Sequence, residues 1–303
     1  MAFRMEKLRQ LWRLVRESHA APLKGEAQRP AVAASDAVAV TFIGHSSFLV
    51  QMAGTAVLID PVFATRLILL RRQRRAGVRV QDLPDIDAVL LTHAHMDHLN
   101  LPSLRAVIRE MRRRGRPAPM VVVPNGVEDL VERLGFAQVV ALSWWEAAKV
   151  RSLTVTATPA KHWGARMFKD THRGFGGYVL EAEGMPSVYH SGDTAYFRGF
   201  AEIGRRLRPQ IALLPIGAYF PDSYRSVHTS PEEALRAFVD VGAGTMIPMH
   251  FNTFKLGREP MDEPLMRLLA AADGAGVGER VRPLVEGESI VVVAPVEELV
   301  VRA

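Results

Sequence analysis

The feature that most constrains this chain is a cluster of three histidines and an aspartate that comes just after a short apolar run. His93, His95, Asp97 and His98 fall within six positions, and residues 88–91 before them read Ala-Val-Leu-Leu. A run of this length predicts a buried strand. Burying so many imidazoles beside a carboxylate is costly unless a metal ion binds them. The sequence therefore predicts a metal site at the end of this strand.

Any metal here must be bound by nitrogen and oxygen atoms, because the sequence contains no cysteine. The absence of disulfides also fits a cytoplasmic location, and the longest apolar stretch, Ile211 to Phe220, has about half the length that a bilayer-spanning helix needs. The 303 residues, 48% of them hydrophobic, can bury a large core. A net charge of +6 favours anionic partners, which include phosphorylated small molecules, a membrane surface and nucleic acid.

Residues 1–20 are predicted to form a basic amphipathic helix. Its apolar residues repeat at helical spacing, and its positive charges are Arg4, Lys7, Arg9, Arg13 and Arg16. Such a helix either docks on its own domain or lies peripherally on an anionic membrane surface. Residues 21–35, rich in Ala and Pro, are predicted to be a linker. The main domain then spans 36–303.

Three further polar residues follow predicted strands elsewhere in the chain. His162 comes after the run 153–159, Asp193 after 187–190, and His250 after 245–249. Loops at one edge of a sheet are where a fold brings distant residues together. The remaining pattern is mostly strands, with helices predicted at 101–111, 127–134, 231–241 and 263–272.

At these residues the sequence resembles the metallo-β-lactamase-fold hydrolases. Their His-x-His-x-Asp-His signature is matched by His93, His95, Asp97 and His98, and His162, Asp193 and His250 follow in the expected order. The resemblance implies an α/β (α+β) fold: a four-layer αββα sandwich of two mixed β-sheets with outer helices. It implies that one metal is held by His93, His95 and His162 and a second by Asp97, His98 and His250. Asp193 would bridge the two.

Seven nitrogen and oxygen ligands suit two Zn²⁺ ions and tolerate Mn²⁺ or Fe²⁺. Two such ions can share a hydroxide that attacks phosphorus or a carbonyl carbon, so the predicted reaction class is hydrolysis. Redox members of the superfamily usually carry Glu at the position of His95, which argues against that branch.

Flanking motifs resemble the N-acyl phosphatidylethanolamine phospholipase D branch and the related ascorbate-phosphate lactonase group. They include residues 42–49, 59–63, 159–163, 192–194, 215–219, 228–234 and 249–254. The resemblance implies a phosphodiesterase that acts on a lipid or small phosphodiester with a metal-bridging hydroxide. A lactonase on a phosphorylated sugar acid is the alternative enzyme. A metal-bound, non-catalytic protein that binds a membrane or partner is the alternative of another class.

Five other residues are candidates for the site. Asp60 either accepts a hydrogen bond from a ligand histidine or forms an Asp-Pro turn. His45 and His228 are predicted to face the substrate, with His228 and Asp97 as catalytic residues, although His228 also stands close to a helix start. Trp163 and Arg166 either line the substrate pocket, with the arginine binding phosphate, or belong to an ordinary surface loop. The other histidines, His19, His172 and His190, fit surface or packing roles.

Residues 66–75 join a four-residue apolar patch to a basic cluster. They either engage acyl chains and lipid headgroups or form a helix with one buried face and a solvated basic face. Nucleic acid is the less favoured partner, because the sequence offers no aromatic-interleaved basic platform.

Overall fold

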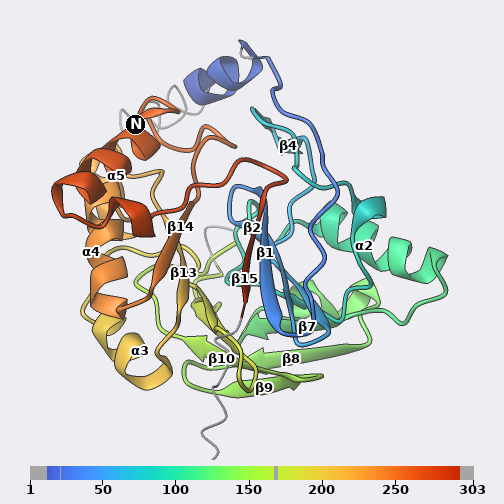
Figure 1. Cartoon of the computed structure of the whole chain (residues 1–303). Helices are drawn as coiled ribbons and strands as arrows, with labels where there is room; N and C mark the ends of the chain where they lie inside the picture. Colours follow the sequence, from blue (N-terminus) through green and yellow to red (C-terminus); the bar gives the residue numbers. More distant parts are fainter. Residues whose placement is uncertain (1–11, 21, 167–169, 294–303) are drawn as a thin grey trace, which may run out of the picture.

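Two β-sheets lie face to face at the centre of the computed structural model, which describes residues 12–20, 22–166 and 170–293 (Figure 1). Within these residues the first sheet has the order β15 (Ser289–Val293), β1 (Ala37–Gly44), β2 (Ser47–Met52), β3 (Thr55–Ile59), β6 (Ala88–Leu90), β7 (Met120–Pro124) and β8 (Gln138–Leu142). The second has the order β14 (Thr245–Met249), β13 (Ile211–Pro215), β12 (Val188–His190), β11 (Gly177–Glu181), β10 (Leu153–Thr158) and β9 (Ala147–Val150).

Both sheets are mixed. Strands β15, β1, β2 and β3 pair antiparallel, whereas β3, β6, β7 and β8 run parallel. In the second sheet β9 to β12 are antiparallel, and β12, β13 and β14 are parallel. These directions place the ends of β1, β3 and β6 at one edge of the first sheet, and the ends of β10, β12 and β14 at one edge of the second. The loops at these two edges carry the polar residues singled out in the sequence.

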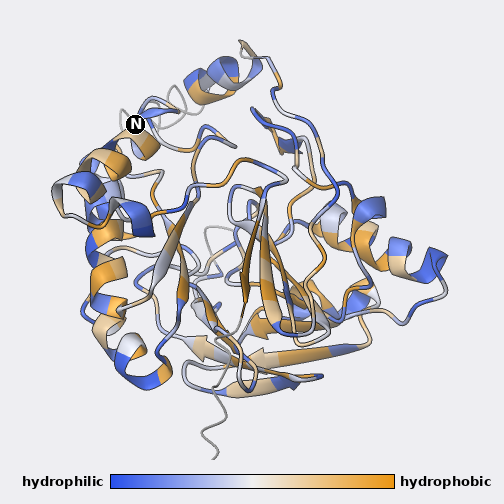
Figure 2. Cartoon of the chain, in the orientation of Figure 1, coloured by the Kyte–Doolittle hydropathy of each residue, from blue (hydrophilic) through white to orange (hydrophobic). Residues whose placement is uncertain are grey.

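Successive side chains of the central strands enter two different hydrophobic cores, one on each face of the sheet. On β2, Phe48 and Val50 face the second sheet, while Leu49 points to the opposite face. The core between the sheets also contains Leu90, Leu180 and Leu213. Both faces of the central strands are covered, and Figure 2 shows these strands as largely hydrophobic ribbons.

Helices cover the two outer faces (Figure 1). Helix α2 (Leu101–Arg113) packs Leu104, Val107 and Met111 on the first sheet. Helices α3 (Gly199–Leu207), α4 (Pro231–Val241) and α5 (Glu263–Gly274) cover the second. The predicted αββα sandwich is confirmed.

The start of α4 shows how the sequence sets a helix boundary. Ser230 is the N-cap and forms a capping box with Glu233, and Pro231 occupies the first turn. His228 therefore has no capping role.

The helix expected over 127–134 is wrong: the segment forms two 3₁₀ turns, Glu128–Leu130 and Glu132–Leu134. Gly126 and Gly135 have positive φ, which interrupts helical geometry at both ends of the segment. The few residues between them are too short a stretch for a stable α-helix.

The described part of the N-terminal helix, residues 12–20, docks on a small hairpin formed by β4 (Arg66–Leu67) and β5 (Leu70–Arg71). Ser18 Oγ accepts a hydrogen bond from the Arg71 amide at 3.1 Å, and Ser18 O accepts one from Gln73 Nε2 at 2.7 Å. Leu14 and Val15 are buried. The rest of the expected helix, 1–11, lies outside the described residues. The helical interpretation of 66–75 is wrong, since residues 66–71 form a hairpin and residues 72–75 are not helical.

Arg72, within the basic cluster, is not on the surface. Its guanidinium is buried and donates to three backbone carbonyls, those of Arg74 at 2.6 Å, Val62 at 2.7 Å and Ile43 at 3.3 Å. Phe254 lies beneath it, with 5.4 Å from Cζ to the ring centroid. Arg72 thus connects the hairpin to the end of β1 and to the loop that follows β3.

The residues that the structure describes contain no helix long and apolar enough to span a bilayer.

Candidate metal centre

A first group of side chains gathers His93, His95, His162 and Asp193, whose candidate ligand atoms all lie within 4.8 Å of one another. His95 Nδ1 is 2.8 Å from His93 Nε2 and 3.3 Å from His162 Nε2. The Asp193 carboxylate oxygen Oδ2 is 3.9 Å from His93 Nε2 and 4.0 Å from His162 Nε2. The loop that follows β6 of the first sheet and the loops that follow β10 and β12 of the second sheet thus meet at one point.

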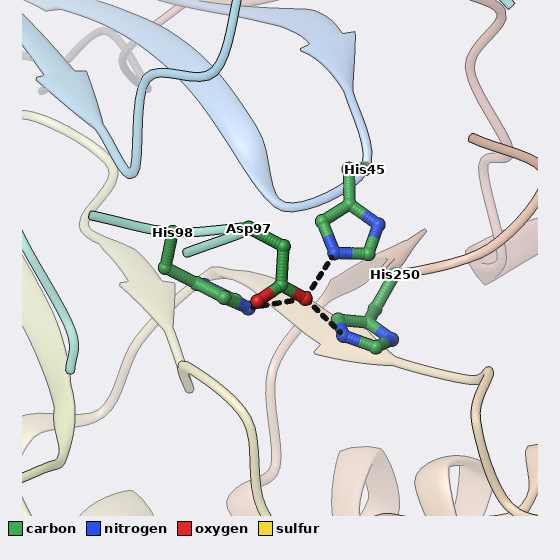
Figure 3. A group of neighbouring side chains, drawn as sticks. All are labelled: His45, Asp97, His98 and His250. Atoms are coloured by element: carbon green, nitrogen blue, oxygen red, sulfur yellow. Dashed lines mark hydrogen bonds and ion pairs between the residues drawn. The ribbon is translucent and has the colours of Figure 1, made fainter. Parts of the chain in front are cut away.

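A second group contains Asp97, His98 and His250, together with His45 (Figure 3). The same Asp193 oxygen lies 3.3 Å from His98 Nε2 and 3.1 Å from His250 Nε2. Asp97 Oδ2 lies 3.8 Å from His98 Nε2 and 3.6 Å from His250 Nε2. Asp193 therefore stands between the two groups, as expected of a carboxylate that bridges two ions.

The second ring nitrogen of three histidines is held by a fixed acceptor. His162 Nδ1 lies 2.8 Å from the Val227 carbonyl, and His98 Nδ1 lies 2.7 Å from Asp60 Oδ2. Thr92 Oγ1 donates to Asp60 at 2.6 Å, so it accepts from His93 Nδ1 at 3.0 Å. Protonation at Nδ1 leaves each Nε2 lone pair free and aimed into the cluster, which is the tautomer that a metal requires.

Electrostatics make the cluster a site for positive charge. Burial lowers the pKa of His93 and His162 well below the usual histidine value. Although burial opposes it, Asp193 raises the pKa of His98 strongly and that of His250 to about 9. Although burial also opposes ionisation of Asp193, the rings of His250 and His98 hold its pKa well below normal. Both carboxylates of the cluster are therefore ionised at neutral pH.

The unpartnered atoms test whether metal ions fit. Within the described residues, Nε2 of His98, Nε2 of His250 and Oδ1 of Asp193 are buried without a hydrogen bond. A buried polar atom left in this state costs about 1–3 kcal/mol. Imidazole nitrogens and carboxylate oxygens at these spacings suit transition-metal ions, which would satisfy all three atoms. The residues present fit metal binding.

Asp60 lies beside the ring of His98, as predicted, whereas the role of Thr92 was not predicted from the sequence. Asp60 accepts from the Thr92 amide at 2.8 Å and from its hydroxyl, in addition to His98. Thr92 gives no sequence signal beyond its place between a strand end and the histidine cluster. Together the two residues orient His93 and His98.

Arg166 and His45, both predicted to contact the substrate, are hydrogen-bonded to the protein itself. Arg166 Nη1 donates to the carbonyls of Ala94 at 2.8 Å and Leu99 at 2.9 Å, so it holds the loop that carries the cluster. His45 is only 1% exposed and lies against Asp97, because the β1–β2 turn directs it inward.

His190, expected on the surface or in packing, is buried between Ser46 O and the Gly192 amide.

Trp163 and His228 lie at the rim of the centre. The Trp163 ring is 46% exposed and stands edge-on to His95, with 4.4 Å between centroids. His228 Nδ1 is 3.8 Å from Asp193 Oδ2 and has no hydrogen bond among the described residues. Burial lowers the pKa of His228 to about 4, so its imidazole is neutral at pH 7.

Residues 55–251 match the family described as beta-lactamase superfamily domain. An uncharacterized protein of Mycobacterium tuberculosis is 35% identical over 264 residues, which cover 81% of this chain and 69% of that protein. The mitochondrial N-acyl-phosphatidylethanolamine-hydrolyzing phospholipase D of Saccharomyces cerevisiae is 31% identical over 253 residues, 79% of this chain and 53% of the yeast protein.

Among solved structures, Igni18, a metallo hydrolase from the archaeon Ignicoccus hospitalis, is 27% identical with a TM-score of 0.64. The alignment covers 84% of this chain and 98% of Igni18.

Proposed function

The chain belongs to the beta-lactamase superfamily domain family and is a metal-dependent hydrolase; from this premise we propose that it is a dinuclear phosphodiesterase acting on a lipid or other small phosphodiester. The observation that carries the proposal is the shared carboxylate: Asp193 Oδ2 lies within 4.0 Å of four histidine Nε2 atoms, two from each ligand group. A two-metal site of this kind suits the displacement at phosphorus. The yeast relative, by its name, hydrolyses a lipid phosphodiester.

We assign the ligands by the two groups. His93, His95 and His162 would hold the first ion, and Asp97, His98 and His250 the second, with Asp193 shared. Bound transition-metal ions would supply Lewis acidity, which lowers the pKa of water and stabilises the negative charge of the transition state. This donor set suits Zn²⁺ and tolerates Mn²⁺ or Fe²⁺, and two Zn²⁺ ions are part of the proposal.

The chain's own residues complete the chemistry. Asp97 is ionised, because its pKa is held well below normal, and its carboxylate accepts a hydrogen bond from the attacking water and orients it. The neutral His228 ring, whose Nδ1 has no hydrogen-bond partner among the described residues, donates a hydrogen bond to a phosphoryl oxygen. The water oxygen bonds to phosphorus, the bond from phosphorus to the leaving alcohol breaks, and the proton ends on that alcohol. Trp163 at the rim packs on the apolar part of the substrate.

A substrate screen tests this function. Metal-loaded protein is expected to hydrolyse bis-p-nitrophenyl phosphate and N-acyl phosphatidylethanolamine, measured as p-nitrophenol release and as lipid phosphomonoester formation. Chelator-treated protein is the control and should lose the activity. Turnover confined to phosphorylated lactones would contradict the proposal and favour the lactonase instead.

We further propose that the N-terminal helix and the β4–β5 hairpin contact an anionic membrane surface. Apolar side chains are exposed on both elements: Trp12 at 59%, Ile68 at 72% and Leu69 at 47%. They lie side by side, since His19 Nε2 is 3.1 Å from the Leu69 carbonyl. Exposed arginines flank the patch, at Arg13, Arg16 and Arg66. Apolar tips among arginines are complementary to acyl chains below anionic headgroups.

Replacing both Ile68 and Leu69 by glutamate should lower binding to phosphatidylserine-containing vesicles at least about fivefold, because each exposed side chain buried in the acyl boundary contributes about 1 kcal/mol or more. Vesicle sedimentation measures the bound fraction. The matched control replaces the exposed Met266 and Leu269 of α5 by glutamate and should bind like wild type. Equal binding by the hairpin variant would refute the membrane contact.

A further inference from the structure

His45 occupies a buried place that neither ligand group requires. It lies in the turn between β1 and β2 with φ of 61°, and its side chain is 1% exposed. The turn is anchored on both sides: the His45 amide donates to Thr253 Oγ1 at 2.8 Å, and the His45 carbonyl accepts from the His250 amide at 2.8 Å. The backbone of His45 and that of the ligand His250 therefore fix each other.

The ring of His45 is directed at Asp97 (Figure 3). Its Nε2 is 3.0 Å from Asp97 Oδ2, which is within hydrogen-bond distance. The same oxygen is 3.6 Å from His250 Nε2 and 3.8 Å from His98 Nε2, separations that leave room for an ion between them. Among these three rings, His45 alone touches the carboxylate itself.

The surroundings decide which nitrogen of His45 carries the proton. Nδ1 has no hydrogen-bond partner among the described residues, and an ionised carboxylate can only accept. Nε2 must therefore donate. The ring is held in place by Phe254, edge-on at 5.3 Å between centroids, and by His250 at 4.2 Å.

We propose that His45 is a positioning residue, whose Nε2–H donates to Asp97 Oδ2 and holds this carboxylate in the orientation that the second metal ion needs. The inference rests on the proposed two-metal function. A ligand carboxylate without its outer hydrogen bond rotates away from the ion, and loss of such partners typically weakens metal affinity about 10- to 100-fold.

Two variants separate positioning from direct ligation. His45→Gln keeps an amide donor at the reach of Nε2, whereas His45→Leu keeps similar bulk without a donor. Both carry the same left-handed backbone penalty. Metal content after dialysis and the visible spectrum of Co²⁺-loaded protein are measured for each, with calorimetric titration of the apoprotein.

We expect His45→Leu to bind one ion normally and the second about 10- to 100-fold more weakly, with a spectral change confined to one of two Co²⁺ signals. His45→Gln should restore both. Wild-type affinity in the leucine variant would overturn the inference, and so would a glutamine variant as weak as the leucine variant, which would make His45 a ligand. Failure of the two-metal premise is distinguishable, because wild-type protein would then bind fewer than two ions. Failure of the phosphodiesterase assignment would show in the substrate screen and leave these metal affinities unchanged.

Discussion

Asp193→Asn is expected to abolish hydrolysis and to remove both metal ions. The substitution keeps the shape of the side chain and removes its charge. Because Asp193 Oδ2 lies 3.1 to 4.0 Å from Nε2 of four histidines, no other described carboxylate can take its place between the two groups. Loss of metal-ion catalysis is worth several kcal/mol, so kcat/KM should fall at least about a thousandfold.

Asp97→Asn is the informative comparison for this variant. Asp97 belongs to the second group alone, so its variant should keep the first ion while losing turnover. Asp262→Asn, at an exposed carboxylate, is the control and should bind two ions and turn over normally. Metal analysis and circular dichroism report on ions and fold separately. An Asp193→Asn protein that retained both ions would rule out the bridging role.

Arg72→Leu should lower the free energy of unfolding by about 3–5 kcal/mol, the usual cost of removing one partner from a buried charged network. The carbonyls of Val62 and Arg74 would lose the guanidinium donor, and the carbonyl of Ile43 would keep only the Gly77 amide. Glu286, buried beside it, would keep only Arg74. Two of these three carbonyls lie next to the turn of His45 and the loop of Asp60, so activity should fall with stability.

Urea unfolding followed by circular dichroism measures this change. Arg75→Leu, at an exposed position of the same cluster, is the matched control and should shift stability by no more than about 0.5 kcal/mol. Arg72→Lys should resemble the leucine variant more than wild type, because an ammonium cannot reach three separate carbonyls. A leucine variant as stable as wild type would show that the buried guanidinium is dispensable.

The metal centre could be anticipated because its parts lie at strand ends. The runs before His93, His162, Asp193 and His250 read as strands and form strands, and the four residues lie in the loops that follow them. The direction of a side chain within a turn could not be anticipated in this way. His45 faces inward because its turn has positive φ and is tied to Thr253 and His250, contacts made by residues some 200 positions away.

Two other differences between the sequence predictions and the structure also arise from tertiary contacts. Arg166 was predicted to bind phosphate, and its Nη1 donates instead to the carbonyls of Ala94 and Leu99. The basic cluster at 66–75 resembled a solvated face, yet Arg72 is drawn into the interior by three carbonyls that the sequence places far apart or in loops. Charge and periodicity describe what a residue prefers, and only the fold determines which backbone groups remain unpaired near it.

The ligands of each proposed ion come from both sheets. His93, His95, Asp97 and His98 follow β6 of the first sheet, while His162, Asp193 and His250 follow strands of the second. Each ion would therefore cross-link the two halves of the sandwich at the edge where their loops meet. Ligands that bind only the folded state add to its stability, by about 4 kcal/mol at a thousand times the dissociation constant. Metal supply would thus govern how long this protein persists in a cell as well as how fast it works.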